Sequence, residues 1–325
     1  AGGDVLYRLQ RDARINIALG FLLPFIIPAV VKATADLLDP ISLSNPQTMI
    51  WTISAWAFLP ASMIMRGIAM GRVAEMIHDK RRRAYQAGGR ITRDRMTREA
   101  PMNAEALDAI ETSDIVVVEG CYDHVELVLG ALDLPYQAIQ AGHLGRVHLR
   151  PEQLMVINCP GQLPAPEIVQ VRDFVAAGGT LFSTDWALRN VLEPAFPGFV
   201  EFNEHPTHDD VVRIDIIESD SPYLTGVLDS EDDPQWWLEG SSYPIRVLDK
   251  EKVRVLITSR ELGEKYGEEP VAVVFNFGKG EVFHMISHYF LQRAEFRNAR
   301  HQRSAASYAA DKGVAFDEAM ADMAS

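Results

Sequence analysis

The chain has 325 residues, of which 47% are hydrophobic and 23% charged, and its net charge is −14. These proportions are ordinary for a folded protein of about two domains. The charge is uneven, because residues 1–98 carry +7, which leaves −21 for residues 99–325. Binding to phosphates needs Lys and Arg on the binding face, so this acidic region makes nucleic acid an unsuitable partner.

Two uncharged apolar runs, residues 15–31 and 48–65, are each near the lower length limit for a membrane-spanning helix. With the polar loop between them they predict a transmembrane hairpin, and a pair of buried helices is the alternative. Basic residues flank the hairpin, so the positive-inside rule predicts a multi-pass protein of the plasma (inner) membrane with both termini and the following domain in the cytoplasm. The side chains expected at the membrane are Phe21, Phe25, Trp51, Trp56 and Phe58.

A basic stalk is expected after the hairpin, with residues 88–89 (Gly-Gly) and Pro101 marking a linker. Its basic cluster either contacts anionic lipid headgroups or serves only as a topology signal. Membrane lipids are therefore expected partners. The residues of the cluster are Lys80, Arg81, Arg82 and Arg83.

From residue 104 onwards, strand and helix patterns alternate. Three strand-to-helix units in succession predict a flavodoxin-like, mostly parallel sheet with helices on both faces, since parallel strands need a crossover connection. The predicted strands are 115–118, 153–158 and a short buried strand after the Gly-Gly turn at 178–179, and the helices that follow them are 122–132, 164–177 and 187–192. Further strands are expected at 211–217 and 253–258, and a hairpin at 270–287.

Both cysteines follow apolar runs that predict buried strands. Because Cys121 and Cys159 are the only two, a disulfide framework is not expected, which fits a reducing compartment. No cleavable signal peptide is expected either, because Lys32 and an acidic loop follow the first apolar run.

Two segments carry a family resemblance. LRPEQLMVINCPGQLPAPEIVQVRDFVAAGGTLFSTDWALRN (residues 149–190), with EEPVAVVFNFGKGEVFHMISHYF (residues 268–290) downstream, resembles the class I glutamine amidotransferase-like superfamily. The nearest likeness is to its non-amidotransferase branches, such as the trehalose-utilisation-like proteins. It covers about residues 111–292, implies their α/β fold, and does not extend to the hairpin.

The resemblance also implies three catalytic parts, of which this sequence keeps one. The cysteine nucleophile of the family would fall within residues 183–186, which contain no cysteine. The oxyanion-hole loop corresponds to residues 159–161, whose proline has no N–H to donate. The catalytic histidine matches His288, but Tyr-Phe follows it where amidotransferases have Pro-Glu. The resemblance therefore implies a pseudoenzyme.

Several interpretations of the strand ends stay open. Ser183, Thr184 or Cys159 would be the nucleophile if the protein is a hydrolase or transferase acting on a sugar or amide, with His288 as base. The favoured interpretation is that Ser183 and Thr184, together with Asp185, cap the helix that follows. A small-molecule sensor is a third possibility. The residues expected to contact a ligand at the strand ends are Cys121, Gly161 and Asp185.

No metal site and no cofactor is predicted. The loop at residues 205–210 holds two histidines and two aspartates, but their spacing matches no strong metal motif. His284 and His288 are four residues apart on the last predicted strand and so would point to the same face, as core or edge histidines or as a ligand pair.

The favoured hypothesis is a membrane-anchored, catalytically degenerate amidotransferase-like protein. It would be a structural or regulatory subunit of a membrane protein complex or a homo-oligomer, and an enzymatic role is left open. The expected organisation is an N-terminal cytoplasmic segment (1–14), a transmembrane hairpin (15–70), a basic stalk and linker (71–103), an amidotransferase-like α/β domain (104–292) and an Ala-rich tail (293–325).

Overall fold

The computed structural model describes residue 79 and residues 82–224, 234–289, 305–311 and 313–315. The predicted hairpin lies outside these residues, together with its Phe21, Phe25, Trp51, Trp56 and Phe58. A span needs a helix of about 20 mainly apolar residues, and no helix in the described part of the chain is long and apolar enough. The prediction of a multi-pass membrane protein is corrected accordingly.

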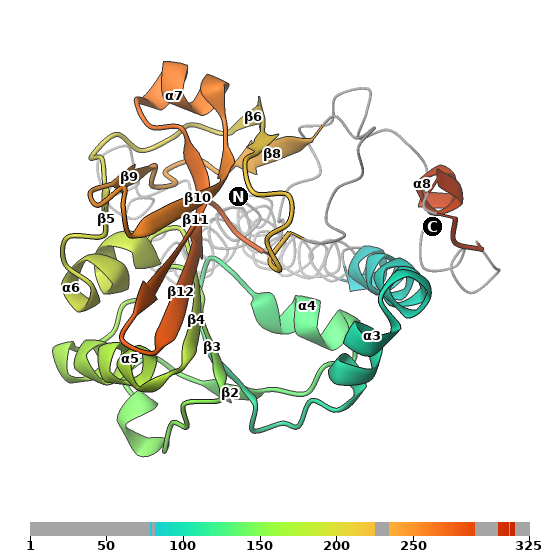
Figure 1. Ribbon diagram of the computed structural model, residues 1–325, viewed down its shortest axis with the longest axis horizontal. Helices are drawn as coiled ribbons and strands as arrows, with labels where there is room; N and C mark the ends of the chain where they lie inside the picture. Colours follow the sequence, from blue (N-terminus) through green and yellow to red (C-terminus); the bar gives the residue numbers. More distant parts are fainter. Residues whose placement is uncertain (1–78, 80–81, 225–233, 290–304, 312, 316–325) are drawn as a thin grey trace, which may run out of the picture. The chain divides into compact units, whose positions relative to one another are not determined.

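The centre of the fold is an eight-stranded sheet in the order β2-β1-β3-β4-β12-β11-β10-β7 (Figure 1). The first five strands in this order run parallel, which confirms the predicted mostly parallel α/β core. The last three add antiparallel pairs. The bounds are β1 (Ile115–Val118), β2 (Gln137–Ile139), β3 (Leu154–Ile157), β4 (Thr180–Thr184), β7 (Asp215–Ile216), β10 (Val253–Thr258), β11 (Pro270–Phe277) and β12 (Gly280–Met285).

Two small antiparallel sheets accompany the large one. β5 (Val200–Phe202) pairs with β9 (Ile245–Val247), and β6 (Asp210–Arg213) pairs with β8 (Gln235–Leu238). The strand predicted at 211–217 is therefore divided. Its first part pairs with β8, and its second part, β7, joins the edge of the large sheet beside β10.

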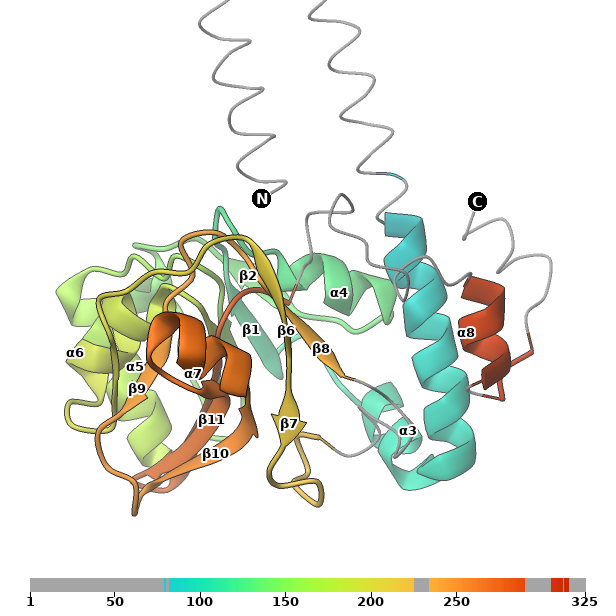
Figure 2. The same cartoon turned by 90° about the horizontal axis from the view of Figure 1, so that it is seen from above.

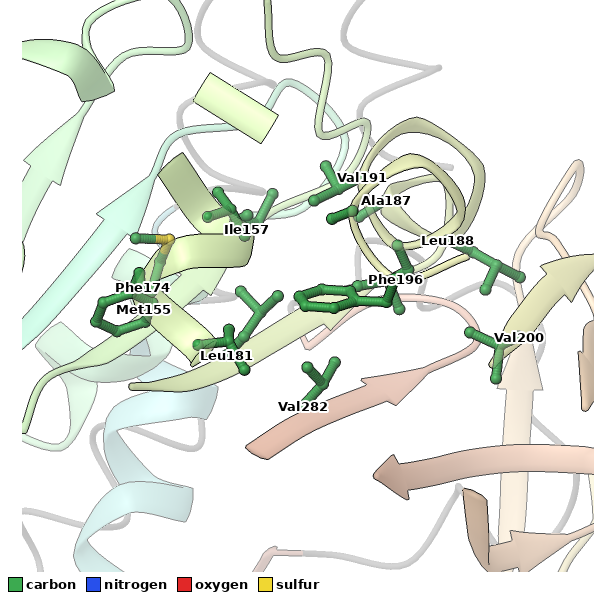
Figure 3. Packing of buried hydrophobic residues seen from close by; sticks show 14 of the residues in the cluster. Met155, Ile157, Phe174, Leu181, Ala187, Leu188, Val191, Phe196, Val200 and Val282 are labelled. Carbon is green, nitrogen blue, oxygen red and sulfur yellow. The ribbon is translucent and has the colours of Figure 1, made fainter. Parts of the chain in front are cut away.

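Helices cover both faces of the sheet, as predicted, and Figure 1 shows α4 and α5 on opposite sides of β3 and β4. Because side chains alternate along a strand, Leu181 of β4 packs on the side of α5 and Phe182 on the side of α4. Figure 3 shows the cluster between the sheet and α5, with Phe174, Leu188 and Phe196 among its members. The helices are α3 (Pro101–Asp108), α4 (Val125–Ala131), α5 (Ala165–Ala177), α6 (Glu193–Ala195), α7 (Arg260–Tyr266) and α8 (Ala305–Asp311), with a 3₁₀ turn η2 (Leu144–Arg146) and a π-helical segment η3 (Leu188–Leu192).

The predicted linker glycines lie inside a helix that runs over residues 82–99, beside α8 and leading to α3 (Figure 2). Gly89 lets this helix approach α4, because a Cβ there would lie 2.5 Å from the carbonyl oxygen of Ala131. Arg93 Nε donates to Leu132 O at 2.9 Å in the same contact. Arg82 and Arg83 are exposed on the first turn, and the other two residues of the basic cluster, Lys80 and Arg81, lie outside the described residues.

Candidate functional site

The turn after β4 is a sharp strand-to-helix elbow. Asp185 has φ +47°, in the left-handed region that residues other than glycine seldom occupy. Its N–H donates to Met285 O at 3.0 Å, and its carbonyl accepts from Leu188 N at 2.9 Å. The elbow position, which the resemblance could place only within four residues, is therefore Asp185.

The Asp185 carboxylate is buried and held by a distant loop. Oδ1 accepts from Tyr243 N at 2.8 Å, and Oδ2 accepts from Ser242 Oγ at 3.0 Å. No side chain caps η3. The capping role predicted for Ser183, Thr184 and Asp185 is therefore wrong, because each of these side chains has its hydrogen-bond partner elsewhere.

His288 lies between two carboxylates just beyond the end of β12. Its Nδ1 is 2.9 Å from Glu239 Oε2 and its Nε2 is 3.4 Å from Asp185 Oδ2, although among the described residues neither nitrogen makes a hydrogen bond of good geometry. Burial lowers the pKa of His288, but Asp185, Cys159 and Glu239 outweigh burial and raise the pKa well above its usual value. The imidazole is therefore protonated near neutral pH.

Cys159 reaches the same place from the loop after β3. Its Sγ, a carboxylate oxygen of Asp185 and a ring nitrogen of His288 all lie within 4.8 Å of one another. The residue is 1% exposed, and its N–H donates to Thr184 Oγ1 at 3.3 Å. Burial, helped by the charge of Asp185 and opposed by His288, raises the pKa of the Cys159 thiol to about 12. The sulfur is therefore a neutral thiol at physiological pH.

The other two candidate nucleophiles bond away from His288. Ser183 Oγ lies 2.9 Å from Nδ1 of His284, and Thr184 Oγ1 donates to Asp123 Oδ2 at 2.9 Å. His284 and His288 do not share a strand face, because β12 ends at Met285 and the backbone turns at Ser287, where φ is +66°. The predicted same-face pair is therefore wrong.

The predicted ligand-contact residues are spread around this cluster. Cys121 is exposed as a residue, but its thiol is partly covered, and this partial burial raises the thiol pKa despite a backbone hydrogen bond and the charge of His288, which both lower it. Gly161, with φ +64°, packs against η3, and a Cβ there would lie 3.0 Å from Cβ of Ala187. Asp185 is the one of the three whose side chain lies in the cluster.

The histidines of the 205–210 loop do not come together as a metal site. His205 Nδ1 lies 2.9 Å from Asn203 O, and the His208 ring faces Tyr266. In the described part of the chain, possible metal-ligand atoms instead converge at Cys159, Asp185 and His288.

Sequence reasoning missed three residues that build the site: Glu239, Ser242 and Ser287. Ser287 Oγ accepts from Glu239 N at 3.2 Å and lies 3.2 Å from Ser242 Oγ. These contacts join residues 45 to 48 positions apart. The segment at residues 230–240 (SEDDPQWWLEG) is acidic, and no local pattern distinguishes Glu239 from its acidic neighbours.

Lowering the pH is expected to destabilise the chain through His284. Burial lowers its pKa to about 3, whereas an unfolded histidine titrates near 6.5, so below pH ~6.5 the unfolded chain binds a proton that the folded chain does not. Stability is full above that pH and falls towards pH ~3, by roughly 2 kcal/mol at pH 5 from this group. Urea unfolding from pH 7 to 5 measures the slope.

The free energy of unfolding should fall less steeply between pH 7 and pH 5 in His284→Asn, whose side-chain amide can still form a hydrogen bond with Ser183. The matched control is His148→Asn, which changes an exposed histidine. Equal slopes in wild type and His284→Asn would contradict the assignment.

No family model and no curated protein sequence matches the chain. Similar solved structures include the GH42 β-galactosidase Gan42B of G. stearothermophilus (14% identity, TM-score 0.37, 53% of this chain and 27% of that one). They also include the exo-β-1,4-mannosidase Op5Man5 from Opitutaceae bacterium strain TAV5 (11% identity, TM-score 0.38, 65% and 34%). A third is a protein assigned as a GMP synthase component from Thermoplasma acidophilum (11% identity, TM-score 0.38, 53% and 81%).

The chain spans about a quarter to a third of the length of the two glycosidases. Similarities this low carry no argument about activity. The resemblance to trehalose-utilisation-like proteins has no support in these comparisons.

Proposed function

We propose that this chain carries an amidotransferase-like α/β domain without amidotransferase activity, and that it works as a structural or regulatory subunit of a protein complex. The observation that carries the proposal is the residue at the elbow. The backbone there turns as a nucleophile elbow does, with φ +47°, and the residue in the turn is Asp185. A protein that keeps the shape of the turn without its thiol has lost the attacking group of this chemistry.

The chemistry of the site supports a non-catalytic role. An activated cysteine nucleophile is a thiolate in an electropositive, accessible place. Cys159 is instead 1% exposed, with a pKa raised to about 12 by burial. Both oxygens of the Asp185 carboxylate accept hydrogen bonds from the loop at residues 242–243, which weakens them as nucleophiles.

The acidic character of the domain supports a role in assembly. Residues 99–325 carry a net charge of −21, which suits a partner with basic surface, since complementary potentials steer association. Native mass spectrometry of the chain isolated from its own cell should find a stoichiometric partner or a homo-oligomer. A monomer with no partner would count against the subunit role.

The purified chain is expected to release no ammonia from glutamine above the rate without protein. In native conditions iodoacetamide should label the exposed Cys121 and leave Cys159 unlabelled, and unfolding in urea should expose both. Peptide mass spectrometry distinguishes the two sites. Ammonia release that disappears in both Cys159→Ser and His288→Asn would overturn the non-catalytic proposal.

A hydrolase that uses Cys159 is the second candidate, because one observation favours it. Cys159, His288 and Glu239 are arranged as a thiol, a histidine and a carboxylate that orients the histidine, with Glu239 Oε2 2.9 Å from Nδ1 of His288. Ser183 and Thr184 bond elsewhere and are set aside. Rapid alkylation of Cys159 in the folded chain would favour this candidate.

A further inference from the structure

Three different ligand groups of the kind that bind zinc meet in the interior of the domain. Cys159, Asp185 and His288 are 1%, 3% and 7% exposed, and their sulfur, oxygen and nitrogen ligand atoms lie within 4.8 Å of one another. They come from the ends of three neighbouring strands, β3, β4 and β12. Thiolate, carboxylate and imidazole together are a zinc-type ligand set.

The spacing of two of these groups fits a shared ion better than a direct bond. A strong hydrogen bond between imidazolium and carboxylate is about 2.7–2.9 Å long, whereas Nε2 of His288 and Oδ2 of Asp185 are 3.4 Å apart. Two ligands at about 2.0–2.1 Å from a tetrahedral zinc ion stand about 3.3–3.4 Å from each other. In the described part of the chain, the buried Nε2 also has no hydrogen bond of good geometry.

The groups around the ligands orient them as metal sites require. Histidine ligands usually place the second ring nitrogen on a carboxylate, and Nδ1 of His288 lies 2.9 Å from Glu239 Oε2. Asp185 is held by Tyr243 N and by Ser242 Oγ. Two of the three ligands thus have their direction set by residues of one loop, 239–243.

We propose that Cys159 Sγ, a carboxylate oxygen of Asp185 and Nε2 of His288 bind one zinc-class divalent cation. Three protein ligands leave one tetrahedral position for a water molecule or a small ligand. Coordination releases the thiol proton of Cys159 and the Nε2 proton of His288 to solvent. The ends of β3, β4 and β12 would then form a metal centre, and this inference does not depend on the absence of glutaminase activity.

The first test uses the unaltered chain, stripped with a chelator and titrated with Co²⁺. A cysteine ligand gives a thiolate-to-cobalt charge-transfer absorption in the near ultraviolet, which should saturate at one ion per chain and disappear when Zn²⁺ displaces the cobalt. Added Zn²⁺ should also raise the Tm of the stripped chain, because a ligand of the native state stabilises it.

Variants then locate the site. Cys159→Ser should lose the absorption, and Asp185→Asn and His288→Asn should each bind Zn²⁺ at least tenfold more weakly, whereas Cys121→Ser and His205→Asn should bind as wild type does. Glu239→Gln keeps all three ligands and should still bind one ion, with an affinity about 10–100 times lower because the imidazole is less well oriented. Circular dichroism confirms that each variant is folded.

Two outcomes would overturn the proposal without any variant: a Co²⁺ titration of the unaltered chain that produces no charge-transfer absorption, or a Tm that Zn²⁺ leaves unchanged. An absorption that survives Cys159→Ser and is lost in Cys121→Ser would also overturn it. None of these results bears on ammonia release from glutamine, so failure of the metal site and failure of the non-catalytic role are distinguishable.

Discussion

Asp185→Ala is expected to lower the free energy of unfolding by about 3–5 kcal/mol, the usual cost of removing one partner of a buried ion pair. The change leaves His288 charged in the interior beside Glu239, and it leaves Tyr243 N and Ser242 Oγ without their acceptor. Urea unfolding with a chelator present measures this effect free of any bound metal.

The matched control is Asp185→Asn. Asparagine tolerates the left-handed backbone of the elbow and can still accept from Tyr243 N, so it should lose clearly less stability than alanine. An Asp185→Ala variant as stable as wild type would refute this structural role. It would show that the free energy needed to desolvate the carboxylate equals the free energy of its interactions.

Phe196→Ala is expected to lower the free energy of unfolding by about 3–5 kcal/mol, as is usual for removing a buried aromatic ring from a core. Phe196 is 0% exposed and packs edge-on against Phe275 and Phe277, with centroids 5.6 Å and 5.0 Å away. Figure 3 shows it between η3 and the strand of Val282. Its loss leaves a cavity between α6 and the sheet.

The urea midpoint should fall in Phe196→Ala with the slope of the transition unchanged, since the slope follows the surface exposed on unfolding, which the substitution hardly changes. Phe196→Leu keeps most of the volume and should lose less. Met102→Ala, at a side chain that is 80% exposed, should change stability by about 0.5 kcal/mol or less. A loss as large in Met102→Ala as in Phe196→Ala would refute the burial argument.

The parallel core could be predicted because its signals are local. The β-branched run at 115–118, the run at 153–158 and the Gly-Gly turn before Thr180 each indicate a buried strand without reference to the rest of the chain, and each became one. The hairpin of β11 and β12 followed from one turn at residues 277–280. The short strands β2, β5 and β9 carried no comparable signal, because each is defined by its pairing.

The predicted membrane placement, unlike the parallel core, was not confirmed. It rested on residues 15–31 and 48–65, which lie outside the described residues, and the described helices supply no span. The basic cluster that suggested orientation is described only at Arg82 and Arg83, at the start of the helix that contacts α4 through Gly89.

The amino-acid sequence by itself predicted an α/β domain over residues 104–292, and the described residues 104–224 and 234–289 have that fold, since hydrophobic period and turn residues act over a few positions. It also determined that no cysteine follows β4. Only the tertiary structure decided that Asp185 is the elbow residue and that Cys159 and His288 converge on it. Only the tertiary structure identified Glu239, because its carboxylate contacts His288, which lies 49 positions further along the chain. No local sequence pattern encodes such a contact.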